Sequence, residues 1–340
     1  MPSTALPIFT TTSGSIGGRQ PRHPRRRAAL VTAVALGLVT ALAACSTSSE
    51  AASTASTGSG TRVVETAKGK VTIPTHPLRV VSIQSYTTES LLDLGVTPVG
   101  VENPGEEYVP QRYLARWKKI PKVVTGASVD LEKIAALKPD LIVGVDVPFL
   151  DKEYAKLTQI APTALATFTD DWTTYPKATA DFTNRDSSLT ALQTKYENRI
   201  RADKKKYASV LKTTSFDVIQ GGFDTGNYWI YSEQSAVGRV LAQLGGHFAS
   251  ATKTVKAGDT SSVSYEKADL LSDADAIVYY ENNDGTPANN IQNLFDLQTF
   301  TDLNASKNGL VIGTPDFLPG SYSDATGILT SVEKALDAKS

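Results

Sequence analysis

The sequence contains few of the residues that build disulfides and metal sites. Its 340 residues include one cysteine and three histidines. A single cysteine cannot form a disulfide within the chain. Iron, zinc and manganese sites made of side chains usually combine several histidines with carboxylates, whereas His76 and His247 are far apart in this sequence. We therefore expect neither a side-chain metal site nor a cofactor.

Motifs of common enzyme active sites are also absent. The sequence contains no Gly-x-Ser-x-Gly elbow, no His-Glu-x-x-His zinc motif, no phosphate-binding loop and no Gly-x-Gly-x-x-Gly fingerprint. Aspartate, serine and histidine occur, but not at a catalytic spacing. The sequence therefore does not favour an enzyme.

The N-terminal 44 residues have the layout of a bacterial export signal. Residues 19–27 contain five arginines, and residues 28–44 form an uninterrupted small or apolar run, whose last three residues, Leu-Ala-Ala, are followed by Cys45. This ending resembles a lipoprotein box, in which the cysteine becomes the lipidated first residue. We predict a signal peptide at residues 1–44 and lipidation of Cys45. The alternative is an ordinary cleaved signal with an incidental cysteine, and both the general secretory and the twin-arginine routes stay open.

Residues 45–61 are rich in Ser, Thr, Ala and Gly and contain one acid. We predict a flexible tether here, which reaches about 20–25 Å as a random coil. Removal of residues 1–44 takes away five arginines and no acids, so the formal charge moves from −1 to −6. That charge argues against nucleic-acid binding. We expect a monomer at the extracytoplasmic face of the cell membrane, held there by its lipid.

One stretch of the chain is repeated. Residues 129–143 (VDLEKIAALKPDLIV) and residues 263–278 (VSYEKADLLSDADAIV) share a helix-capping residue, a Glu-Lys pair and an Ile-Val strand core. Glu132 and Glu266 occupy the same early helical position, where the helix dipole favours a carboxylate. Solenoid repeats are far shorter than this spacing of 134 residues. The repeat therefore predicts two similar lobes.

A second repeated pattern supports this duplication. Residues 82–101 and 231–250 each contain a helix that ends in Leu-Gly. Strands alternate with helices in both halves, which predicts βαβ units and mostly parallel sheets. We predict an α/β fold with two Rossmann-like lobes, residues 62–172 and 211–340. Ligands bind such sheets beyond the carboxyl ends of the strands.

A long helix is expected to connect the lobes within residues 173–210. Residues 181–210 contain neither glycine nor proline, and their apolar residues follow one helical stripe. A helix of this length would span about 45 Å. The alternative is a pair of helices broken near Asp186, since Asp and Ser can cap a new helix.

Four stretches of the sequence carry a family resemblance: residues 79–101, 130–142, 160–163 and 316–322. They resemble the class III substrate-binding proteins of ABC importers, which serve ferric siderophores, haem and cobalamin. The resemblance covers nearly all of residues 61–340. It implies two Rossmann-like lobes bridged by one long helix, limited closure on binding, and delivery of the ligand to a membrane permease.

The resemblance also implies a role for the two repeated glutamates. In that family one glutamate per lobe docks onto arginine pockets of the permease dimer, and Glu132 and Glu266 match these positions. Taken alone, each would simply favour its helix N-terminus. Two acids related by the duplication suit a symmetric partner, so we predict docking to an ABC permease dimer.

The loops expected at the ligand crevice are aromatic and acidic, and Arg112 and Arg185 are their nearest bases. A strongly anionic ferric catecholate or citrate would require a cluster of Arg and Lys. A neutral or cationic ferric hydroxamate suits aromatic walls with polar groups. We predict a ferric siderophore of the hydroxamate type, with haem or cobalamin as alternatives. The predicted ligand-binding residues are Tyr86, Tyr108, Trp172, Arg185, Trp229, Tyr280 and Tyr322.

Alternatives to these predictions stay open. For any single aromatic residue the alternative is packing in the core. A lipid-anchored extracytoplasmic enzyme is the alternative from another class, and a surface adhesion or structural lipoprotein is a third. The first lacks a catalytic motif, and the last gives an aromatic crevice no purpose.

Overall fold

The computed structural model describes residues 60–338, so the predicted signal peptide, Cys45 and nearly all of the predicted tether lie outside the described residues. The first described element is a hairpin of β1 (Thr61–Thr66) and β2 (Gly69–Pro74), which pair antiparallel. Gly69 closes its turn with a φ of 94°, a left-handed conformation that favours glycine. Sequence analysis did not predict this hairpin. Within residues 60–338 the structure shows no helix with the length and hydrophobicity of a membrane span.

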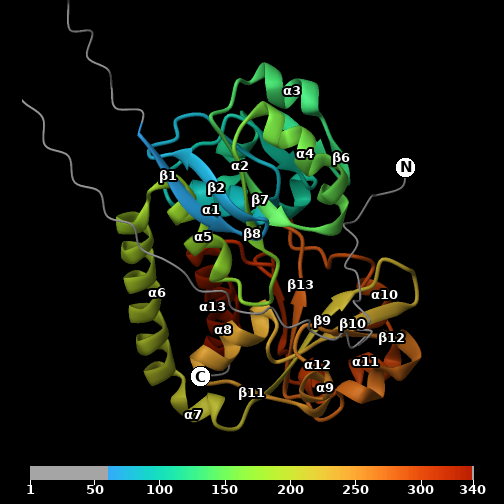
Figure 1. Ribbon diagram of the computed structural model, residues 1–340. Coiled ribbons are helices and arrows are strands. Elements are labelled where there is room, and N and C mark those ends of the chain that lie inside the picture. The colour runs from blue at the N-terminus through green and yellow to red at the C-terminus, as the bar shows by residue number, and fades with distance from the viewer. Residues whose placement is uncertain (1–59, 339–340) are drawn as a thin grey trace, which may run out of the picture. The chain divides into compact units, whose positions relative to one another are not determined.

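The N-terminal lobe is built on two three-stranded sheets (Figure 1). Their strands are β3 (Val80–Ser82), β7 (Leu141–Asp146), β8 (Thr163–Thr167), β4 (Val101–Asn103), β5 (Lys122–Thr125) and β6 (Ser128–Val129). The sheet of order β3-β7-β8 is parallel throughout. Residues 141–145 of β7 are all buried, as expected of a parallel strand that is covered on both faces. The surrounding helices are α1 (Ser85–Asp93), α2 (Gln111–Trp117), α3 (Leu131–Ala136) and α4 (Asp151–Ile160), with short 3-10 turns η1 (Glu106–Tyr108) and η2 (Pro148–Leu150).

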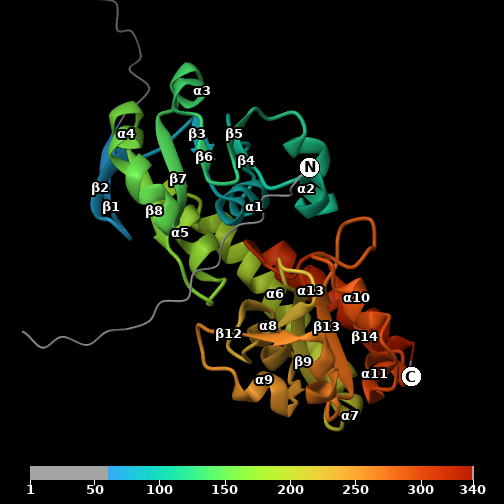
Figure 2. The same ribbon diagram turned by 90° about the vertical axis from the view of Figure 1, so that its right-hand side faces the viewer.

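The C-terminal lobe has one six-stranded sheet of order β12-β10-β9-β13-β14, with β11 beside β9. Its strands are β9 (Ser215–Gly221), β10 (Asn227–Tyr231), β11 (His247–Phe248), β12 (Thr260–Ser264), β13 (Ala276–Tyr280) and β14 (Val311–Thr314). Strands β11, β9, β13 and β14 run parallel, whereas β10 is antiparallel to both of its neighbours. Its helical elements are α8 (Ala236–Leu244), α9 (Ser250–Thr254), η3 (Tyr265–Leu271), α10 (Gln292–Phe295), α11 (Gln298–Thr301), α12 (Asn304–Lys307) and α13 (Tyr322–Asp337). Figure 2 shows the strands of this sheet apart from those of the other lobe.

The two copies of the repeated stretch begin with the predicted caps. Asp130 accepts a hydrogen bond from the Lys133 amide at 2.9 Å and begins α3. Ser264 accepts one from the Glu266 amide at 3.4 Å and begins η3, which is a 3-10 helix rather than an α-helix. The second pattern also recurs, because α1 and α8 are both followed by a left-handed glycine, with φ of 81° at Gly95 and 97° at Gly245.

The connection between the lobes differs from the prediction of one helix over residues 181–210. The structure has three helices here: α5 (Thr174–Thr183), α6 (Asp186–Lys206) and α7 (Ala208–Leu211). Asn184 adopts a left-handed conformation with φ of 54° and ends α5. Asparagine tolerates this conformation better than most residues, so the chain can break without a glycine. The long helix is therefore α6, whose 21 residues span about 30 Å rather than 45 Å. The alternative of a break near Asp186 is close to what is observed.

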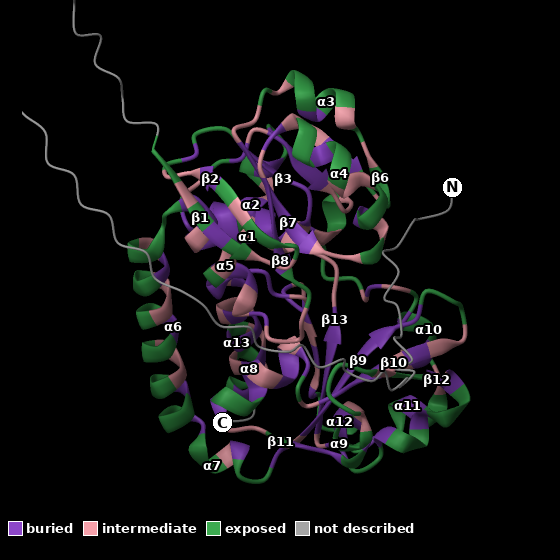
Figure 3. Ribbon diagram, in the orientation of Figure 1, coloured by how far each residue is buried: buried purple, intermediate pink, exposed green. Residues whose placement is uncertain are grey.

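Residues 102–121 have no clear hydrophobic period in the sequence, and no helix is predicted there. This segment contains η1 and α2. Tyr113 and Trp117, four positions apart on α2, are the buried residues of that helix. Figure 3 shows buried residues along the strands of both lobes and exposed residues on the outer face of α6.

Candidate functional site

Aromatic side chains gather where the strands of the two lobes end. Tyr108 follows β4 in the N-terminal lobe, and Tyr280 is the last residue of β13 in the C-terminal lobe; their ring centroids are 6.0 Å apart. The Tyr108 hydroxyl also reaches the Asn289 side chain, at 3.5 Å. The structure therefore brings these two predicted ligand-binding residues together across the lobes.

Further rings complete this tyrosine cluster. Tyr280 stacks on Phe317 at 5.6 Å, and Phe317 packs edge-on against Tyr231 at 5.3 Å. Tyr86, in the first turn of α1, stacks on Tyr175 of α5 at 4.6 Å. Burial raises the pKa of Tyr86, and the neighbouring Tyr175, Tyr231, Glu89 and Tyr280 raise it further. We use the name tyrosine cluster for Tyr86, Tyr108, Tyr175, Tyr231, Tyr280 and Phe317.

Two hydroxyl groups of the tyrosine cluster are unbonded. Tyr231 donates to the Gln220 side chain at 2.6 Å, and Tyr175 donates to the Thr169 carbonyl at 2.7 Å. In contrast, the hydroxyls of Tyr86 and Tyr280 form no hydrogen bond with any described residue. Burial also raises the pKa of Tyr280 well above its usual value, so both hydroxyls keep their protons at neutral pH. They are therefore free donors.

Two other predicted residues lie in a second group of rings, the Trp172 cluster (Trp172, Tyr196 and Tyr322), which belongs to the same hydrophobic core as Tyr231, Tyr280 and Phe317. Trp172 is 1% exposed and packs edge-on against Tyr322 at 5.0 Å and Tyr196 at 5.5 Å. Both tyrosine hydroxyls are bonded internally: Tyr196 donates to Gln243 at 2.6 Å, and Tyr322 accepts from Gln193 at 3.1 Å. In this structure Trp172 and Tyr322 are core residues, the alternative left open for each aromatic residue.

The remaining predicted residues, Trp229 and Arg185, lie outside both clusters. Trp229 is half-buried and packs edge-on against the partly exposed Phe223 at 4.8 Å. Arg185 is exposed at the start of α6, and within residues 60–338 its side chain has no hydrogen bond, ion pair or ring contact.

The other basic candidate, Arg112, is occupied by acidic partners. Its Nη1 atom lies 2.5 Å from Asp316 Oδ1 and 2.6 Å from Asp324 Oδ1. Both aspartates are buried, whereas 31% of the Arg112 side chain is exposed. Glu89 lies beside this group, and burial followed by the charge of Asp324 raises its pKa. Three carboxyl groups thus surround one guanidinium.

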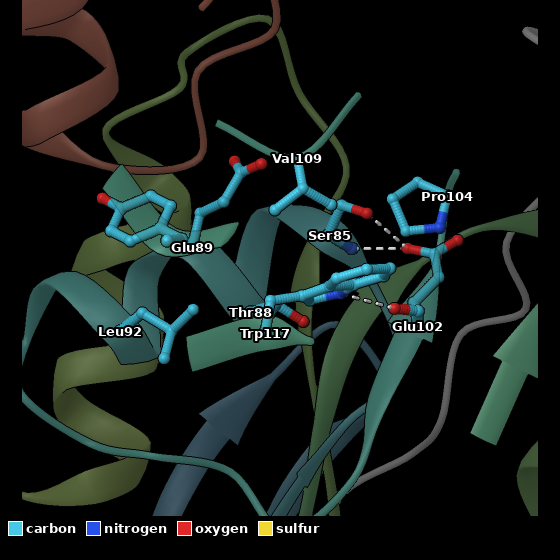
Figure 4. A pocket seen from close by; sticks show the side chains of 9 residues that line it. Ser85, Thr88, Glu89, Leu92, Glu102, Pro104, Val109 and Trp117 are labelled. Atoms are coloured by element: carbon cyan, nitrogen blue, oxygen red, sulfur yellow. Dashed lines mark hydrogen bonds between the residues drawn. The ribbon is translucent and has the colours of Figure 1, made fainter. Parts of the chain in front are cut away.

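A small pocket beside α1 contains a second buried carboxyl group (Figure 4). Glu102 is 2% exposed and accepts hydrogen bonds from the Ser85 amide at 2.5 Å and hydroxyl at 2.8 Å. Burial raises the pKa of Glu102 to about 7, against the opposing effect of these bonds. The pocket volume is about 10 Å³, room for about one water molecule. Glu102 is therefore a cap for α1 rather than part of a ligand site.

A larger cavity of about 420 Å³ lies between α6 and α13. Its lining includes Lys195 and Tyr196 of α6 and Thr326 and Gly327 of α13, with Arg112 at one side. Tyr196 and Tyr322 of the Trp172 cluster line this cavity, whereas no ring of the tyrosine cluster does. The rings of the tyrosine cluster pack against one another, and Phe317 is 1% exposed. A ligand at the tyrosine cluster would therefore have to part these rings.

The repeated glutamates are both accessible. Glu132 and Glu266 are exposed in the first turns of α3 and η3, and neither forms an ion pair within the described part of the chain. The histidines are separated: His76 bonds to Asn184 at 3.2 Å, and His247 is exposed on β11. Among residues 60–338, no three His, Cys, Asp or Glu side chains are arranged to hold a metal ion.

The chain matches the family described as periplasmic binding protein over residues 80–317. It belongs to this family. Such proteins are the substrate-binding components of ABC transporters, not enzymes. The family resemblance and the prediction of a two-lobed α/β fold are thereby confirmed.

Three similar proteins are named as substrate-binding or siderophore-binding proteins. This periplasmic binding protein is 29% identical over 289 residues to YhfQ of Bacillus subtilis, a putative ABC transporter substrate-binding lipoprotein, covering 79% of this chain and 87% of YhfQ. It is 31% identical to YfiY, a probable siderophore-binding lipoprotein of the same organism, covering 73% and 76%. The siderophore periplasmic binding protein from the fuscachelin gene cluster of Thermobifida fusca superposes with a TM-score of 0.67 at 26% identity, covering 78% of this chain and 98% of that structure.

Several residues of the candidate site were not predicted from the sequence. Tyr175 and Tyr231 join the tyrosine cluster, and Asp316 and Asp324 neutralise Arg112. Tyr231 could have been found, because it ends a strand (β10) directly before the repeated helix pattern of residues 231–250. The two aspartates could not, because their partner is more than 200 positions away in sequence.

Proposed function

We propose that this periplasmic binding protein captures a ferric siderophore of the hydroxamate type at the tyrosine cluster and delivers it to the permease of its ABC importer. The observation that carries the proposal is the pair of unbonded hydroxyls on Tyr86 and Tyr280, set among stacked rings from both lobes. Such hydroxyls can donate hydrogen bonds to the oxygen atoms of a chelate, while the rings cover its apolar parts.

The electrostatic surroundings support a ligand without strong negative charge. Among the largest influences on the pKa of Tyr280, the charged groups are the carboxyls of Glu89 and Asp316. Arg112 is already held by two aspartates. A polyanionic catecholate or citrate complex would lack the bidentate arginine contacts that stabilise such ligands. A neutral or cationic ferric hydroxamate would not need them.

Binding can be tested by native mass spectrometry and tryptophan quenching with a panel of ligands. We expect ferrioxamine B to bind, and ferric citrate, a ferric tris-catecholate, haemin and cobalamin to bind at least about a hundredfold more weakly. Preferential binding of haemin or cobalamin would replace the siderophore with another ligand of the same transport class. Binding of none of these, together with turnover of an ester or glycoside, would contradict the transport function itself.

Delivery to the permease is proposed to use Glu132 and Glu266. Their exposure, their lack of ion pairs and their matching positions in the two repeats support this role. The variant with both Glu132→Ala and Glu266→Ala should lose siderophore uptake in cells and keep its affinity for the ligand. The matched control replaces two other exposed glutamates, Glu65 and Glu197, by alanine and should keep both. Loss of binding in the first variant would show that these glutamates act elsewhere.

Membrane attachment is proposed to use lipidated Cys45, which lies outside the described residues. The N-terminal sequence layout supports it, and the names of two relatives include the word lipoprotein. Replacement of Cys45 by serine should release the protein from the membrane fraction and remove the acyl groups from the N-terminal peptide in a mass spectrum. An unacylated wild-type N-terminus would contradict the anchor.

A further inference from the structure

One segment of the C-terminal lobe is held by two helices of the N-terminal lobe. We call residues 315–324 the seam segment; they comprise the connection from β14 to α13 and the first turn of α13. From α2, Arg112 bonds to Asp316 and Asp324, and the Tyr113 hydroxyl lies 2.9 Å from Ser321 Oγ. All of these contacts join residues about 200 positions apart, so they link the lobes rather than neighbours in the chain.

Helix α1 adds contacts to the same segment. The Ser90 hydroxyl donates to the Gly320 carbonyl at 2.5 Å, and Asp93 accepts from the Ser323 amide at 3.1 Å. The seam segment is also bonded internally, since Asp324 accepts from the Gly320 amide at 3.2 Å and Ser321 caps α13. Asp324 therefore accepts a hydrogen bond from the backbone before α13 and also forms an ion pair with Arg112.

Two glycines make this approach possible. A Cβ atom at Gly320 would lie 2.7 Å from the Tyr86 Cα atom. A Cβ atom at Gly327, one turn into α13, would lie 1.8 Å from Asp316 Oδ2 and 2.6 Å from Arg112 Nη2. Neither glycine is needed for its backbone conformation, because neither has a positive φ. Both instead provide the space in which the N-terminal lobe meets the seam segment.

The seam segment also carries a ring of the ligand site. Phe317, next to Asp316, stacks on Tyr280 and contacts Tyr231. Any displacement of Asp316 would therefore move Phe317, and with it the surface around the free Tyr280 hydroxyl. A guanidinium that holds both oxygens of Asp316 restricts that movement because its fork geometry is rigid.

We propose that Arg112 is a positioning residue: it holds the seam segment against α1 and α2, and so sets the place of Phe317 and Tyr280 in the ligand site without touching the ligand. The part of this inference that concerns ligand affinity rests on the proposed function; the part that concerns the seam segment does not. Removal of Arg112 leaves Asp316 and Asp324 as buried acids without a counter-charge, which is a strongly unfavourable arrangement.

The test uses three variants of the full mature protein. Arg112→Met removes the charge and keeps most of the side-chain volume. Arg112→Lys keeps the positive charge but lacks the planar guanidinium that binds both oxygens of Asp316. The matched control is Arg116→Met. Arg116 lies one turn further along α2, covers the same Tyr113 ring, and bonds only to the Leu92 carbonyl of its own lobe.

Three measurements distinguish the outcomes. In the ligand-free protein, hydrogen exchange of peptides covering residues 315–324 should be at least about tenfold faster in Arg112→Met, intermediate in Arg112→Lys and unchanged in Arg116→Met. The near-ultraviolet circular dichroism of the tyrosines should weaken in the same order. The Kd for ferrioxamine B should rise about tenfold in Arg112→Met, partly recover in Arg112→Lys, and stay within about twofold of wild type in Arg116→Met.

Several outcomes would overturn the inference. Unchanged exchange in Arg112→Met would show that Arg112 does not hold the seam segment, and a loss of affinity with unchanged exchange would make Arg112 a direct ligand contact. Faster exchange with unchanged dichroism and affinity would show that the seam segment does not place the rings. If wild type binds no siderophore, the proposed function fails, while exchange and dichroism still decide the role of Arg112. Should Arg112→Met not fold, Gly327→Ala, which keeps both charges and forces them apart, gives the same test.

Discussion

The tyrosine cluster and the Trp172 cluster are both made of aromatic rings packed edge to face or face to face, yet they treat their hydroxyl groups differently. In the Trp172 cluster both hydroxyls are bonded within the protein, to Gln243 and Gln193. In the tyrosine cluster Tyr86 and Tyr280 have unbonded hydroxyls. A core usually satisfies its polar atoms, so the unbonded hydroxyls of Tyr86 and Tyr280 are the observation on which the proposed binding surface rests.

Of the substitutions that distinguish the two clusters, Trp172→Ala is expected to have the largest effect on stability. Trp172 is 1% exposed between two tyrosines, so its removal leaves a cavity and should lower the free energy of unfolding by about 3–5 kcal/mol. Urea unfolding followed by far-ultraviolet circular dichroism measures this change. Ligand affinity of the folded protein should stay the same.

The matched control is Trp229→Ala, because Trp229 is only half-buried and should cost distinctly less stability. A Trp172→Ala protein of normal stability that no longer binds ferrioxamine B would place Trp172 in the ligand site, as the sequence suggested. That result would remove the contrast between the two clusters.

A second test concerns the pH dependence of stability. Neither cluster contains a group that changes its charge near neutral pH, so the test uses Glu102, which lies outside both clusters. Burial raises the pKa of Tyr280 and of Tyr196 above the usual tyrosine value. Burial also raises the pKa of Glu102 from 4.5 to about 7. The folded protein therefore holds the Glu102 proton more tightly than the unfolded chain does, so this stabilisation is complete below pH 4.5 and is lost as the pH rises through about 7.

Glu102→Gln should accordingly make the free energy of unfolding less dependent on pH. The difference between the two pKa values corresponds to about 3 kcal/mol, so the variant should gain up to about that much over wild type at pH 8 and little at pH 5. A glutamine oxygen can still accept from Ser85. Thermal unfolding across this pH range measures the change, with Glu65→Gln on the exposed hairpin as control. Parallel profiles for wild type and Glu102→Gln would contradict the assignment.

Much of the fold could be predicted from local patterns. The structure has a helix that ends at the predicted Leu244-Gly245 (α8) and a strand at the repeated Ile277-Val278 core (β13), because their apolar residues follow a clear period and their ends carry clear signals. The break before α6 was predicted only as the alternative to one long helix, because Asn184 is compatible with both a helix and a left-handed cap. Tertiary packing, and not the local sequence, decides whether the helix ends or continues at Asn184.

The site was predictable only in part. Tyr86, Tyr108 and Tyr280 were predicted as ligand-binding residues because each follows a strand or lies in a loop at its end, and the structure places them in one cluster. Trp172 could not be told apart from them, because its burial depends on Tyr196 and Tyr322, which are distant in sequence. Composition finds aromatic residues, but only the fold shows which hydroxyls have partners.

A third test examines the edge of the tyrosine cluster with Tyr108→Ala. The Tyr108 ring is half-buried next to Tyr280, so its loss should weaken ferrioxamine B binding about tenfold, as expected for the removal of one aromatic contact. The matched control is Tyr154→Ala, a half-buried tyrosine of the same lobe whose hydroxyl donates to the Thr163 carbonyl at 3.4 Å. Equal affinity losses in the two variants would show that the effect is one of lobe stability and not of the cluster.

The smallest effects provide the sharpest comparison, since they remove a single oxygen atom from each cluster. Tyr280→Phe deletes an unbonded hydroxyl, so the free energy of unfolding should change by less than about 0.5 kcal/mol. The Kd for ferrioxamine B should rise about fivefold, the equivalent of one hydrogen bond. Tyr322→Phe deletes the acceptor of Gln193, so unfolding should become easier by about 1 kcal/mol while the Kd is unchanged. If Tyr280→Phe instead costs stability and leaves the Kd alone, both clusters are core, and the ligand must be sought at another place where the lobes meet.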